Sequence, residues 1–481
     1  MNTNYIKKTK IISSVGPATR TEEKITELYK AGVNVIRINF SHADYENTSR
    51  IVEIVKRLNK EGITKLGLLG DLKWPEIRLG DYEGVKTYKK WDIFNIFVDK
   101  TLACEGLDQF CDYPYLIEDV AIGQTVRIES GIFDVLVKEK TTNSLVVEAL
   151  NDTTIKQRRH VNLPGTTIKL PGLIDQDKEN VLFCIENEFD YIAMSFVRNA
   201  AHIKELRDIL IAHNVGHIGI ISKVENQEWL DHIEEIVDAS DGVMVARGDL
   251  GIEIDISLIP VRQKKIVKLC RSKGKFVIVA TQLIESMMES PFPTRAEVSD
   301  IFNAVVQKAD AVMTSGETAL GKYPIECISM MKKIILQAES IVNYTYQDFD
   351  NNTYTTTDLE KKALIKSAID IADALQINNI IVFTISGKLA KIAAAYRPRV
   401  NIFAFTNQKT TLTNTVCYFG IKSRHIPYKH HSEALEEALR TMVKMGDIKN
   451  DERTIVITDI LKNGHENPTL EIIHVGKFLG V

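Results

Sequence analysis

The sequence contains no long hydrophobic run and no large excess of either charge. Its apolar runs fall well short of the roughly 20 residues that a membrane-spanning helix needs. The first ten residues, MNTNYIKKTK, lack the apolar core of a secretory signal peptide. A formal net charge of -4, with acidic and basic residues interspersed, gives no general attraction to nucleic acid or to anionic lipid. We therefore expect small-molecule partners, with no nucleic acid and no membrane among them.

Cysteine is also scarce, with six residues in a chain of 481. The cysteines show no metal-ligand spacing, and several fall inside apolar periodic stretches, which favours buried reduced thiols over disulfides. A reducing compartment fits this pattern, so we predict a cytoplasmic protein. The six positions are Cys104, Cys111, Cys184, Cys270, Cys327 and Cys417.

Eight short runs rich in branched aliphatic residues predict β-strands, and most precede a segment with helical periodicity. The helical segments 21–32, 46–62 and 201–216 each end at or near a glycine, as helices commonly do. Eight such units in succession predict an α/β fold with a closed parallel (β/α)8 TIM barrel, whose active groups lie at the carboxyl ends of its strands. The runs are TKIISSVG, NVIRINFS, LGLLGDLK, DYIAMSFV, IGIISKVEN, GVMVARGDLG, FVIVATQ and AVMTSGE.

The remaining segments predict two further domains, as expected for a chain too long for one core. Residues 81–161 interrupt the barrel with the strand-like runs TVRIES, FDVLVKEK and SLVVEAL, which indicate a small β-rich domain placed to act as a lid. After a polar stretch, NNIIVFT, VNIFAFT, RTIVITDI and LEIIHVG indicate an open-sheet α/β domain over 350–481. The barrel then comprises 1–80 and 162–345.

Charged side chains follow two buried strands at the point where each strand ends. Lys223 and Glu225 close one run, and Asp249 follows the next. Because a parallel strand is buried on both faces, charges at its end must pair, bind a ligand or meet solvent. Two carboxylates are too few for a calcium site but suit Mg²⁺ or Mn²⁺, which keep waters and share substrate oxygens such as those of a phosphate. Lys223 would neutralise a transferring phosphoryl group or an enolate.

The alternative is a purely structural charge network that braces the barrel mouth. Polar residues at the other strand ends disfavour it, because too much polarity converges on one face. The full set is Arg37, Asn39, Ser41, Asp71, Lys73, Lys223, Glu225, Asp249, Thr281, Ser315 and Glu317. A second motif, residues 316–322, matches a phosphate-binding P-loop up to its lysine, but Tyr323 replaces the metal-binding hydroxyl, which disfavours a P-loop NTPase.

Over nearly its whole length the chain resembles the pyruvate kinase family. The motifs that carry the resemblance are KTKIISSVGPATR, VIRINFSHA, LPGLIDQDKEN, YIAMSFVRNA, IISKVEN, VMVARGDLG, ATQLIESM, PTRAEVSDI and SGETALGKYP, in the family's order. The resemblance implies a barrel domain A, an inserted domain B and a regulatory domain C. It also implies glycolytic phosphoryl transfer from phosphoenolpyruvate to ADP, giving ATP and pyruvate through a Mg²⁺-bound enolate, and a homotetramer.

The resemblance also implies roles for the residues at the strand ends. Glu225 and Asp249 would bind Mg²⁺, and Lys223 would stabilise the phosphoryl group and the enolate oxygen. Arg37 would grip the phosphate, and Gly248 would contact the substrate. Thr281 would bind the substrate carboxylate and route the proton, with Ser315 as a relay. The K⁺ ligands would be Asn39, Ser41, Asp71 and the Leu72 carbonyl, and nucleotide contacts would come from Asn39, Phe40, Ser41, His42, Arg78 and Arg159.

Several positions depart from the family pattern. Trp74 stands where the family usually has glycine, beside the expected K⁺ and ADP sites, and Glu129-Ser130 replaces two aspartates in the lid. Glu76 matches members that need K⁺, whereas Leu72 and Leu79 resemble those that do not. The charge argument favours a K⁺ requirement, because no lysine at 76 supplies the positive charge.

A loop in the C-terminal domain, TISGKLA, resembles the family's phosphate loop and would bind an effector such as a sugar phosphate or a nucleotide. Leu389 replaces one of its hydroxyls, and a plain strand-to-helix turn is an equal alternative. The residues of this candidate effector site are Thr384, Ser386, Gly387 and Lys388. Two other functions stay open at this point: a metal-dependent lyase or aldolase acting on pyruvate enolate, and an effector-sensing binding protein whose nucleotide site Trp74 blocks.

Overall fold

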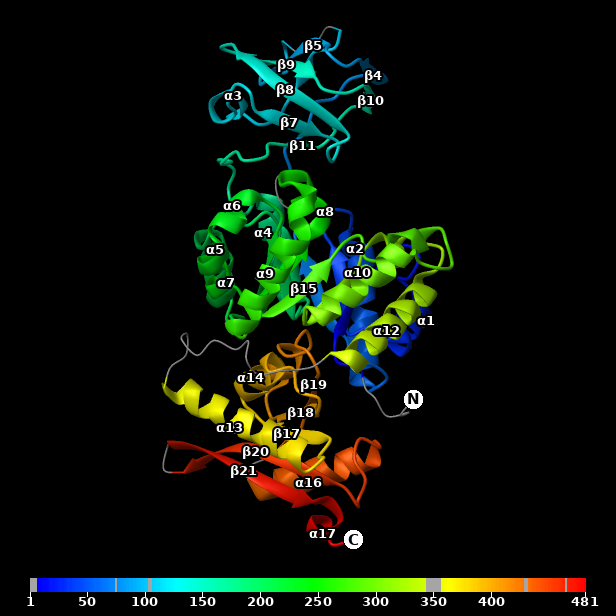
Figure 1. Ribbon diagram of the computed structural model, residues 1–481, viewed down its shortest axis with the longest axis vertical. Coiled ribbons are helices and arrows are strands. Elements are labelled where there is room, and N and C mark those ends of the chain that lie inside the picture. Colours follow the sequence, from blue (N-terminus) through cyan, green and yellow to red (C-terminus); the bar gives the residue numbers. More distant parts are fainter. Residues whose placement is uncertain (1–6, 74–75, 103–105, 343–355, 428–430, 463–464) are drawn as a thin grey trace.

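The structure, a computed structural model, describes residues 7–73, 76–102, 106–342, 356–427, 431–462 and 465–481. Figure 1 shows three bodies stacked along the long axis, with the β-rich insertion at one end, the barrel in the middle and the C-terminal sheet at the other end. Trp74, Cys104 and the segment between 345 and 350 lie outside the described residues. The predicted domain boundaries themselves stay predictions.

The central body is a closed barrel of eight parallel strands in the order β1-β16-β15-β14-β13-β12-β3-β2. Every one of the eight predicted runs forms one of these strands, so the predicted fold class is confirmed. The strands are β1 (Lys10–Ser14), β2 (Val35–Asn39), β3 (Gly67–Asp71), β12 (Tyr191–Met194), β13 (Gly219–Val224), β14 (Gly242–Ala246), β15 (Phe276–Ala280) and β16 (Ala311–Thr314).

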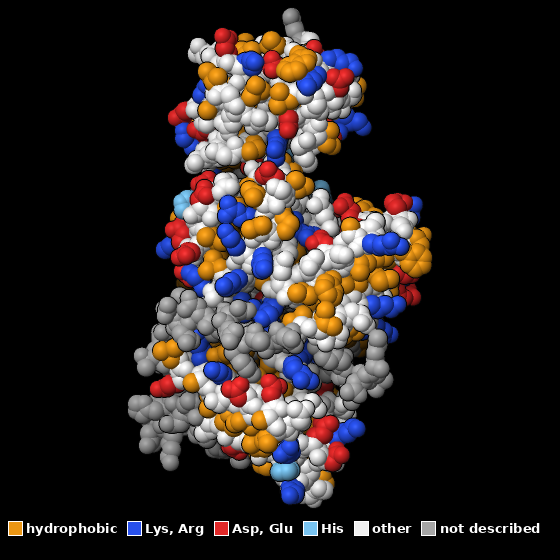
Figure 2. All heavy atoms as spheres, in the orientation of Figure 1, with side chains coloured by type: hydrophobic (Ala, Val, Ile, Leu, Met, Phe, Trp, Pro, Cys, Tyr) orange, Lys and Arg blue, Asp and Glu red, His pale blue; other side chains and the backbone are white. Residues whose placement is uncertain are grey.

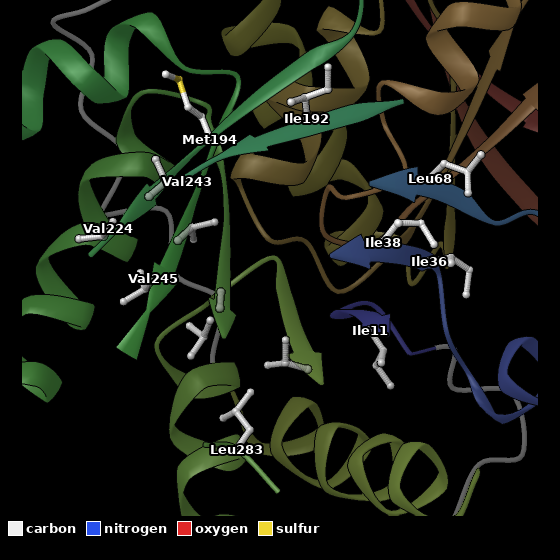
Figure 3. Packing of buried hydrophobic residues seen from close by; sticks show 14 of the residues in the cluster. Ile11, Ile36, Ile38, Leu68, Ile192, Met194, Val224, Val243, Val245 and Leu283 are labelled. Carbon is white, nitrogen blue, oxygen red and sulfur yellow. The ribbon is translucent and has the colours of Figure 1, made fainter. Parts of the chain in front are cut away.

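Alternate residues of the barrel strands pack into two different clusters. Ile11, Ile36 and the other side chains labelled in Figure 3 join the residues of the surrounding helices. Ile12 and Val35 join a second cluster, which also contains residues of the C-terminal domain. Because successive side chains of a strand point to opposite faces, both faces of the sheet are buried. This explains why the strands read as continuous apolar runs.

The barrel helices begin at residues suited to capping their free backbone N–H groups. Thr21 and Asp44 cap the first two helices, and Thr294 forms a capping box with Glu297. The helices are α1 (Glu22–Ala31), α2 (Tyr45–Lys60), α4 (Asp175–Glu186), α5 (Ala200–Ala212), α6 (Gln227–Asp231), α7 (Ile233–Ala239), α8 (Arg247–Glu253), α9 (Ile259–Ser272), α10 (Arg295–Val306), α11 (Gly316–Ala319) and α12 (Pro324–Ile341), with 3-10 turns η1 (Ile256–Leu258) and η2 (Glu285–Met288).

The insertion holds a six-stranded sheet, β11-β7-β8-β9-β5-β6, and a two-stranded sheet, β10-β4. The three predicted runs correspond to β7 (Thr125–Ile128), β8 (Phe133–Lys140) and β9 (Ser144–Ala149). Rings of Tyr88, Phe94 and Phe133 meet in the core of the insertion. Its other elements are β4 (Val85–Tyr88), β5 (Ile93–Phe97), β6 (Gln109–Phe110), α3 (Leu116–Asp119), β10 (Thr153–Lys156) and β11 (Val161–Asn162).

The C-terminal domain is an open five-stranded sheet in the order β19-β18-β17-β20-β21. The four predicted strands are present; β20 pairs antiparallel with β21, and the three other pairs described in this sheet are parallel. The fifth strand, β19, has the sequence IKSRH, which contains no apolar run and was not predicted. The elements are α13 (Thr356–Ala374), β17 (Asn379–Phe383), α14 (Lys388–Ala395), β18 (Asn401–Thr406), α15 (Lys409–Thr413), β19 (Ile421–His425), α16 (His431–Lys444), β20 (Arg453–Lys462), β21 (His465–His474) and α17 (Val475–Leu479).

Two sequence expectations about the molecule as a whole can be compared with the structure. The five described cysteines are all buried and free, as predicted. Within the described ranges, no helix combines the length and the apolar character needed to cross a bilayer. Figure 2 shows acidic and basic side chains intermixed over the viewed face.

A buried ion pair joins the barrel to the C-terminal domain. Nη2 of Arg397, which follows α14, lies 2.6 Å from Oδ2 of Asp310, just before β16. The other oxygen of Asp310 accepts a hydrogen bond of 3.0 Å from the backbone N–H of Phe419. Both charged side chains are almost fully buried, with relative exposures of 2% and 1%. Removing one partner would leave the other as an uncompensated charge inside the interface.

We predict that Arg397→Ala lowers the free energy of unfolding by about 3–5 kcal/mol, the usual cost of leaving one member of a buried pair alone. Urea denaturation followed by circular dichroism measures this. The matched control is Arg440→Ala, which removes an exposed pair with Glu436 on α16 and should change the free energy by less than about 1 kcal/mol. Equal effects of the two substitutions would show that the Asp310 pair does not hold the interface.

Candidate active site

Lys223 lies at the centre of the charged groups on the carboxyl side of the barrel. Its Nζ is 2.8 Å from Oε1 of Glu225 and 3.4 Å from Oδ1 of Asp71. It also donates a 2.8 Å hydrogen bond to Oγ of Ser195. Burial opposes the charge on this lysine, but Asp71, Glu225 and Asp249 outweigh burial and raise its pKa. The lysine is therefore a fixed ammonium between Glu225, which follows its own strand, and Asp71 at the end of β3.

Arg37 supplies the second positive charge. Its Nε donates to Oδ2 of Asp71 at 2.8 Å, and its Nη1 donates to Oγ of Ser14 at 2.7 Å. Burial alone would raise the pKa of Asp71, but Lys223 and Arg37 outweigh it, so that this pKa is lowered. Asp71 is thus held ionised between two cations.

Glu225 is completely buried, and its two oxygens have different partners. Oε2 accepts a 2.6 Å hydrogen bond from the backbone N–H of Phe196. Oε1 lies 2.8 Å from Nζ of Lys223 in an ion pair. Burial raises the pKa of Glu225 to about 7, and the nearby charge of Asp249 adds to this shift. A bound cation would favour the ionised form of this carboxyl group.

Asp249 and Gly248 lie in the first turn of α8, beside the residue that follows β15. The backbone N–H of Gly248 donates to Oγ1 of Thr281 at 2.8 Å, and this hydroxyl donates to the carbonyl of Ala280 at 2.7 Å. Thr281 has a φ of +65° and Gln282 has a φ of +53°. A β-branched residue with positive φ is strained, and such strain persists only where the surroundings hold it.

Arg247, which was not assigned a role from the sequence, holds this strained turn. Its Nη2 donates to the Thr281 carbonyl at 2.6 Å, and its Nε donates to the Ala280 carbonyl at 3.3 Å. Nη1 binds Asp300 of α10 at 2.7 Å. One guanidinium therefore fixes two successive carbonyls and links them to a neighbouring helix.

Ser315 is less clearly connected to the other predicted residues. It precedes α11, and its backbone N–H donates to Oε2 of Glu317 at 2.7 Å. Glu317 is buried, and burial raises its pKa. The contacts that place Thr281 come from Gly248 and Arg247 and do not include Ser315. The relay role of Ser315 stays a prediction.

The oxygens expected to bind K⁺ lie around the ends of β2 and β3. The side-chain oxygen of Asn39 accepts a hydrogen bond of 3.2 Å from the Ser41 N–H. The carbonyl of Leu72 accepts a 3.0 Å hydrogen bond from Oγ of Ser195, and Oδ1 of Asp71 accepts none. A carbonyl and a carboxylate oxygen can each accept a further partner. The donor set is therefore compatible with a weakly hydrated cation.

The expected nucleotide residues are only partly exposed at this site. The side chain of Phe40 packs in the core against Phe183 and Phe189, which leaves its backbone as the part that can face a ligand. His42 is exposed. Lys73 is exposed as well, and its backbone N–H donates to Asp177.

Arginines at the junction with the insertion are already paired with carboxylates. Nε of Arg78 donates to Oε2 of Glu76 at 2.8 Å, and Nη1 of Arg159 lies 3.2 Å from Oε1 of Glu129. Burial lowers the pKa of the neighbouring His160, although the negative charges of Glu76 and Asp249 act in the opposite direction. A nucleotide phosphate would have to compete with these carboxylates for the two guanidinium groups.

The insertion also contacts the far end of α8. A guanidinium nitrogen of Arg127 donates to the Ile252 carbonyl, and Nδ2 of Asn162 donates to Oε1 of Glu253 at 2.8 Å. Burial raises the pKa of Glu253 to about 7, although Asn162 and Arg127 oppose this shift. The helix that carries Asp249 is therefore held by Arg247 at its first turn and by the insertion at its last.

The candidate effector loop is a tight turn at the start of α14. The backbone N–H of Gly387 donates to Oγ1 of Thr384 at 3.0 Å, and Gly387 has a φ of +80°. Ser386 and Lys388 are exposed, whereas Leu389 is buried in the core. These contacts form a strand-to-helix turn, and the effector site stays a prediction.

The structure brings most of the predicted residues to one end of the barrel and adds four that the sequence analysis did not assign. Ser14, Ser195 and Phe196 hold the ion pairs, and Arg247 holds Thr281. Ser14, Ser195 and Phe196 stand inside or directly after predicted strands, and their position at a strand end was the available signal. Among the described residues, no group of three or more His, Cys, Asp or Glu side chains could hold a metal. A metal at Glu225 and Asp249 would therefore take most of its ligands from substrate and water.

Two family models match the chain. "Pyruvate kinase, barrel domain" matches residues 6–328, and "Pyruvate kinase, alpha/beta domain" matches residues 362–473. Together these ranges cover most of the chain.

Individual relatives agree with the family models. A pyruvate kinase of Geobacillus stearothermophilus is 35% identical over 476 residues, which are 98% of this chain and 80% of that protein. A pyruvate kinase of Clostridium perfringens is 35% identical over 458 residues, covering 94% and 96%. A crystal structure of a pyruvate kinase from Cryptosporidium parvum superposes with a TM-score of 0.90 at 32% identity, covering 97% of this chain and 96% of that one.

We predict a pH-dependent stability from Glu253. Its folded pKa of about 7 lies above the ordinary value of 4.5, so the folded state binds the proton more tightly than the unfolded state does. As pH rises from about 5 to 8, the metal-free wild type should lose roughly 1–3 kcal/mol of stability relative to Glu253→Gln. Urea denaturation across this pH range measures the difference. The exposed Glu53→Gln on α2 is the control, and a flat difference for Glu253→Gln would refute the prediction.

Proposed function

This chain belongs to the pyruvate kinase family, and on that premise we propose that it transfers the phosphoryl group of phosphoenolpyruvate to ADP, giving ATP and pyruvate. The observation that carries the proposal is the ammonium of Lys223, held between Asp71 and Glu225 at the carboxyl end of the barrel. Phosphoryl transfer depends mostly on positioning and on stabilisation of negative charge. A buried lysine with a raised pKa supplies both at pH 7.

Glu225 and Asp249 would hold Mg²⁺ or Mn²⁺ beside this lysine. Bound there, the ion would supply positive charge to the substrate's carboxylate and phosphoryl oxygens. The fit rests on two neighbouring carboxylates: the buried Glu225, whose Oε1 has the Lys223 ammonium at 2.8 Å, and Asp249, whose charge helps to raise the pKa of Glu225. Gly248 lies in the same turn as Asp249. Its N–H is oriented by the hydrogen bond that it donates to Oγ1 of Thr281.

The other residues orient the substrate and move the proton. Arg37, fixed by Asp71 and Ser14, would grip the phosphate. Lys223 would stabilise the enolate oxygen that remains when the phosphoryl group leaves. Thr281 would bind the substrate carboxylate and route a proton to the methylene carbon, with Ser315 as its relay partner.

A monovalent cation and the nucleotide would complete the site. Asn39, Ser41, Asp71 and the Leu72 carbonyl would hold K⁺ near the phosphate. ADP would lie along Asn39, Phe40, Ser41, His42, Arg78 and Arg159, after the last two have exchanged their carboxylate partners for phosphate. The residues 81–161 would act as the lid over this site, between the two barrel segments 1–80 and 162–345.

Three further features belong to the proposal and rest on family resemblance. The chain would assemble as a homotetramer. Domain C, residues 350–481, would bind a regulatory anion at Thr384, Ser386, Gly387 and Lys388. A cytoplasmic location agrees with the five described cysteines, which are all buried free thiols.

An assay of phosphoenolpyruvate with ADP separates this function from its alternatives. A lyase or aldolase acting on pyruvate enolate would turn over without nucleotide. A binding protein whose nucleotide site is blocked by Trp74 would give no ATP at all. ATP formation that depends on both substrates supports the proposed kinase.

We predict that Lys223→Met lowers kcat by at least about 100-fold while substrate affinity changes little, since an interaction made mainly in the transition state is removed. Steady-state kinetics measures both quantities. Lys204→Met, on the exposed face of α5, is the matched control and should keep wild-type kcat. A Lys223→Met variant with most of its turnover would exclude the assigned role.

We also predict that the enzyme is activated by K⁺. Glu76 is bound by the Arg78 guanidinium and brings no positive charge to the phosphate site. Replacing K⁺ by tetramethylammonium at constant ionic strength should lower the rate roughly several-fold, and Glu76→Lys should reduce that dependence. Equal wild-type rates in the two salts would contradict the prediction. They would show that Leu72 and Leu79, and not Glu76, identify this chain as one of the members that do not need K⁺.

A further inference from the structure

One aromatic contact joins the insertion to the strand ends that carry the candidate metal site. His160 immediately precedes β11, and its backbone carbonyl accepts a 2.9 Å hydrogen bond from the Glu129 N–H. Its backbone also forms an isolated bridge with Arg78. The ring of His160 meets the ring of Phe196 at a centroid distance of 6.5 Å and an interplanar angle of 68°. Edge-to-face geometry of this kind is the attractive arrangement for two aromatic rings.

Phe196 is also the residue that holds one oxygen of Glu225. Its backbone N–H donates to Oε2 at 2.6 Å, while Lys223 faces Oε1 at 2.8 Å. The two oxygens of this buried carboxylate are therefore fixed from two different strand ends. Phe196 contacts the carboxylate through an uncharged backbone N–H, whereas Lys223 contacts it through an ammonium. Phe196 therefore orients the carboxylate without adding positive charge next to a metal.

The backbone of Phe196 is in a conformation that needs support. Its φ of +47° lies in the left-handed region, which is strained for a bulky side chain. A residue keeps such a conformation only where its surroundings hold it. If φ relaxed toward an ordinary negative value, the chain on the amino side of Phe196 would move, and its N–H would no longer aim at Glu225. The rings and side chains packed around Phe196 therefore control where that carboxylate points.

We propose that His160 is a positioning residue for the metal site: its ring holds Phe196 in the strained conformation that aims the backbone N–H at Glu225. His160 pairs with Arg78 through its backbone and packs on Phe196 through its ring. It therefore links the start of the insertion to the Glu225 carboxylate. The inference rests on the proposed function only in taking Glu225 as a metal ligand. The size and shape of the ring carry the effect, so a phenyl ring at position 160 should serve.

Direct binding of Mn²⁺ to the protein without substrates tests the link, with electron paramagnetic resonance reporting free Mn²⁺. His160→Ala and Phe196→Leu should each raise the Mn²⁺ dissociation constant about three- to tenfold, the effect expected for the loss of one aromatic pair. The double variant should bind about as weakly as the weaker single variant, because both changes remove the same contact. His160→Phe should bind nearly as wild type, and so should His213→Ala, an exposed histidine that follows α5.

The outcomes separate this inference from the metal assignment beneath it. If Glu225→Gln weakens Mn²⁺ binding but His160→Ala does not, the link from His160 is wrong and the metal site stands. If Glu225→Gln has no effect, the metal site and the inference both fail. Additive effects of His160→Ala and Phe196→Leu would also overturn the inference. Thermal unfolding of each variant shows whether it is folded, and His160→Leu replaces His160→Ala if the latter is not.

Discussion

Compensation of buried charge is the constraint on which the rest of this structure depends. Asp71 and Glu225 are almost completely buried, and an isolated carboxylate in such a place would be neutralised or would destabilise the fold. Lys223 and Arg37 lie between these carboxylates and keep Asp71 ionised. Each of the four groups comes from the end of a parallel strand, so the barrel must close in its observed order for the charges to meet. The site is an outcome of strand order as much as of residue type.

Backbone strain accompanies this charge network and is confined by specific contacts. Phe196, Thr281 and Gln282 all have positive φ, and the first two hold a carboxylate oxygen of Glu225 and the N–H of Gly248, respectively. The Arg247 guanidinium fixes the turn at Thr281, and packing against His160 supports Phe196. Strained residues of this kind are typical of sites where a donor must be aimed before the ligand arrives.

The insertion and the C-terminal domain contact the barrel at opposite ends. The insertion contacts the last turn of α8 through Arg127 and Asn162, and the first turn of the same short helix carries Asp249. The C-terminal domain contacts the opposite end of the barrel through the buried pair of Arg397 and Asp310. At that end a Cβ on Gly242 would lie 2.3 Å from the ring of Phe276, so there is no room for a side chain at this position.

The sequence by itself determined the strands, their parallel closure and the chemistry at their ends. Runs such as FVIVATQ are apolar on both faces, which only a buried parallel strand requires, and a charge directly after such a run has to be functional or paired. Short elements with little apolar content escaped this reasoning: β19 has no apolar run, and β6 and β11 have two residues each. Their pairing is supplied by neighbouring strands rather than by local pattern.

Tertiary structure alone decided that Phe196 aims an N–H at Glu225, that Arg247 holds Thr281, and that Arg78 and Arg159 are paired with Glu76 and Glu129. The physical reason is that hydrogen bonds and ion pairs depend on distances of a few ångströms between residues far apart in the chain, whereas periodicity records only which faces of an element are buried.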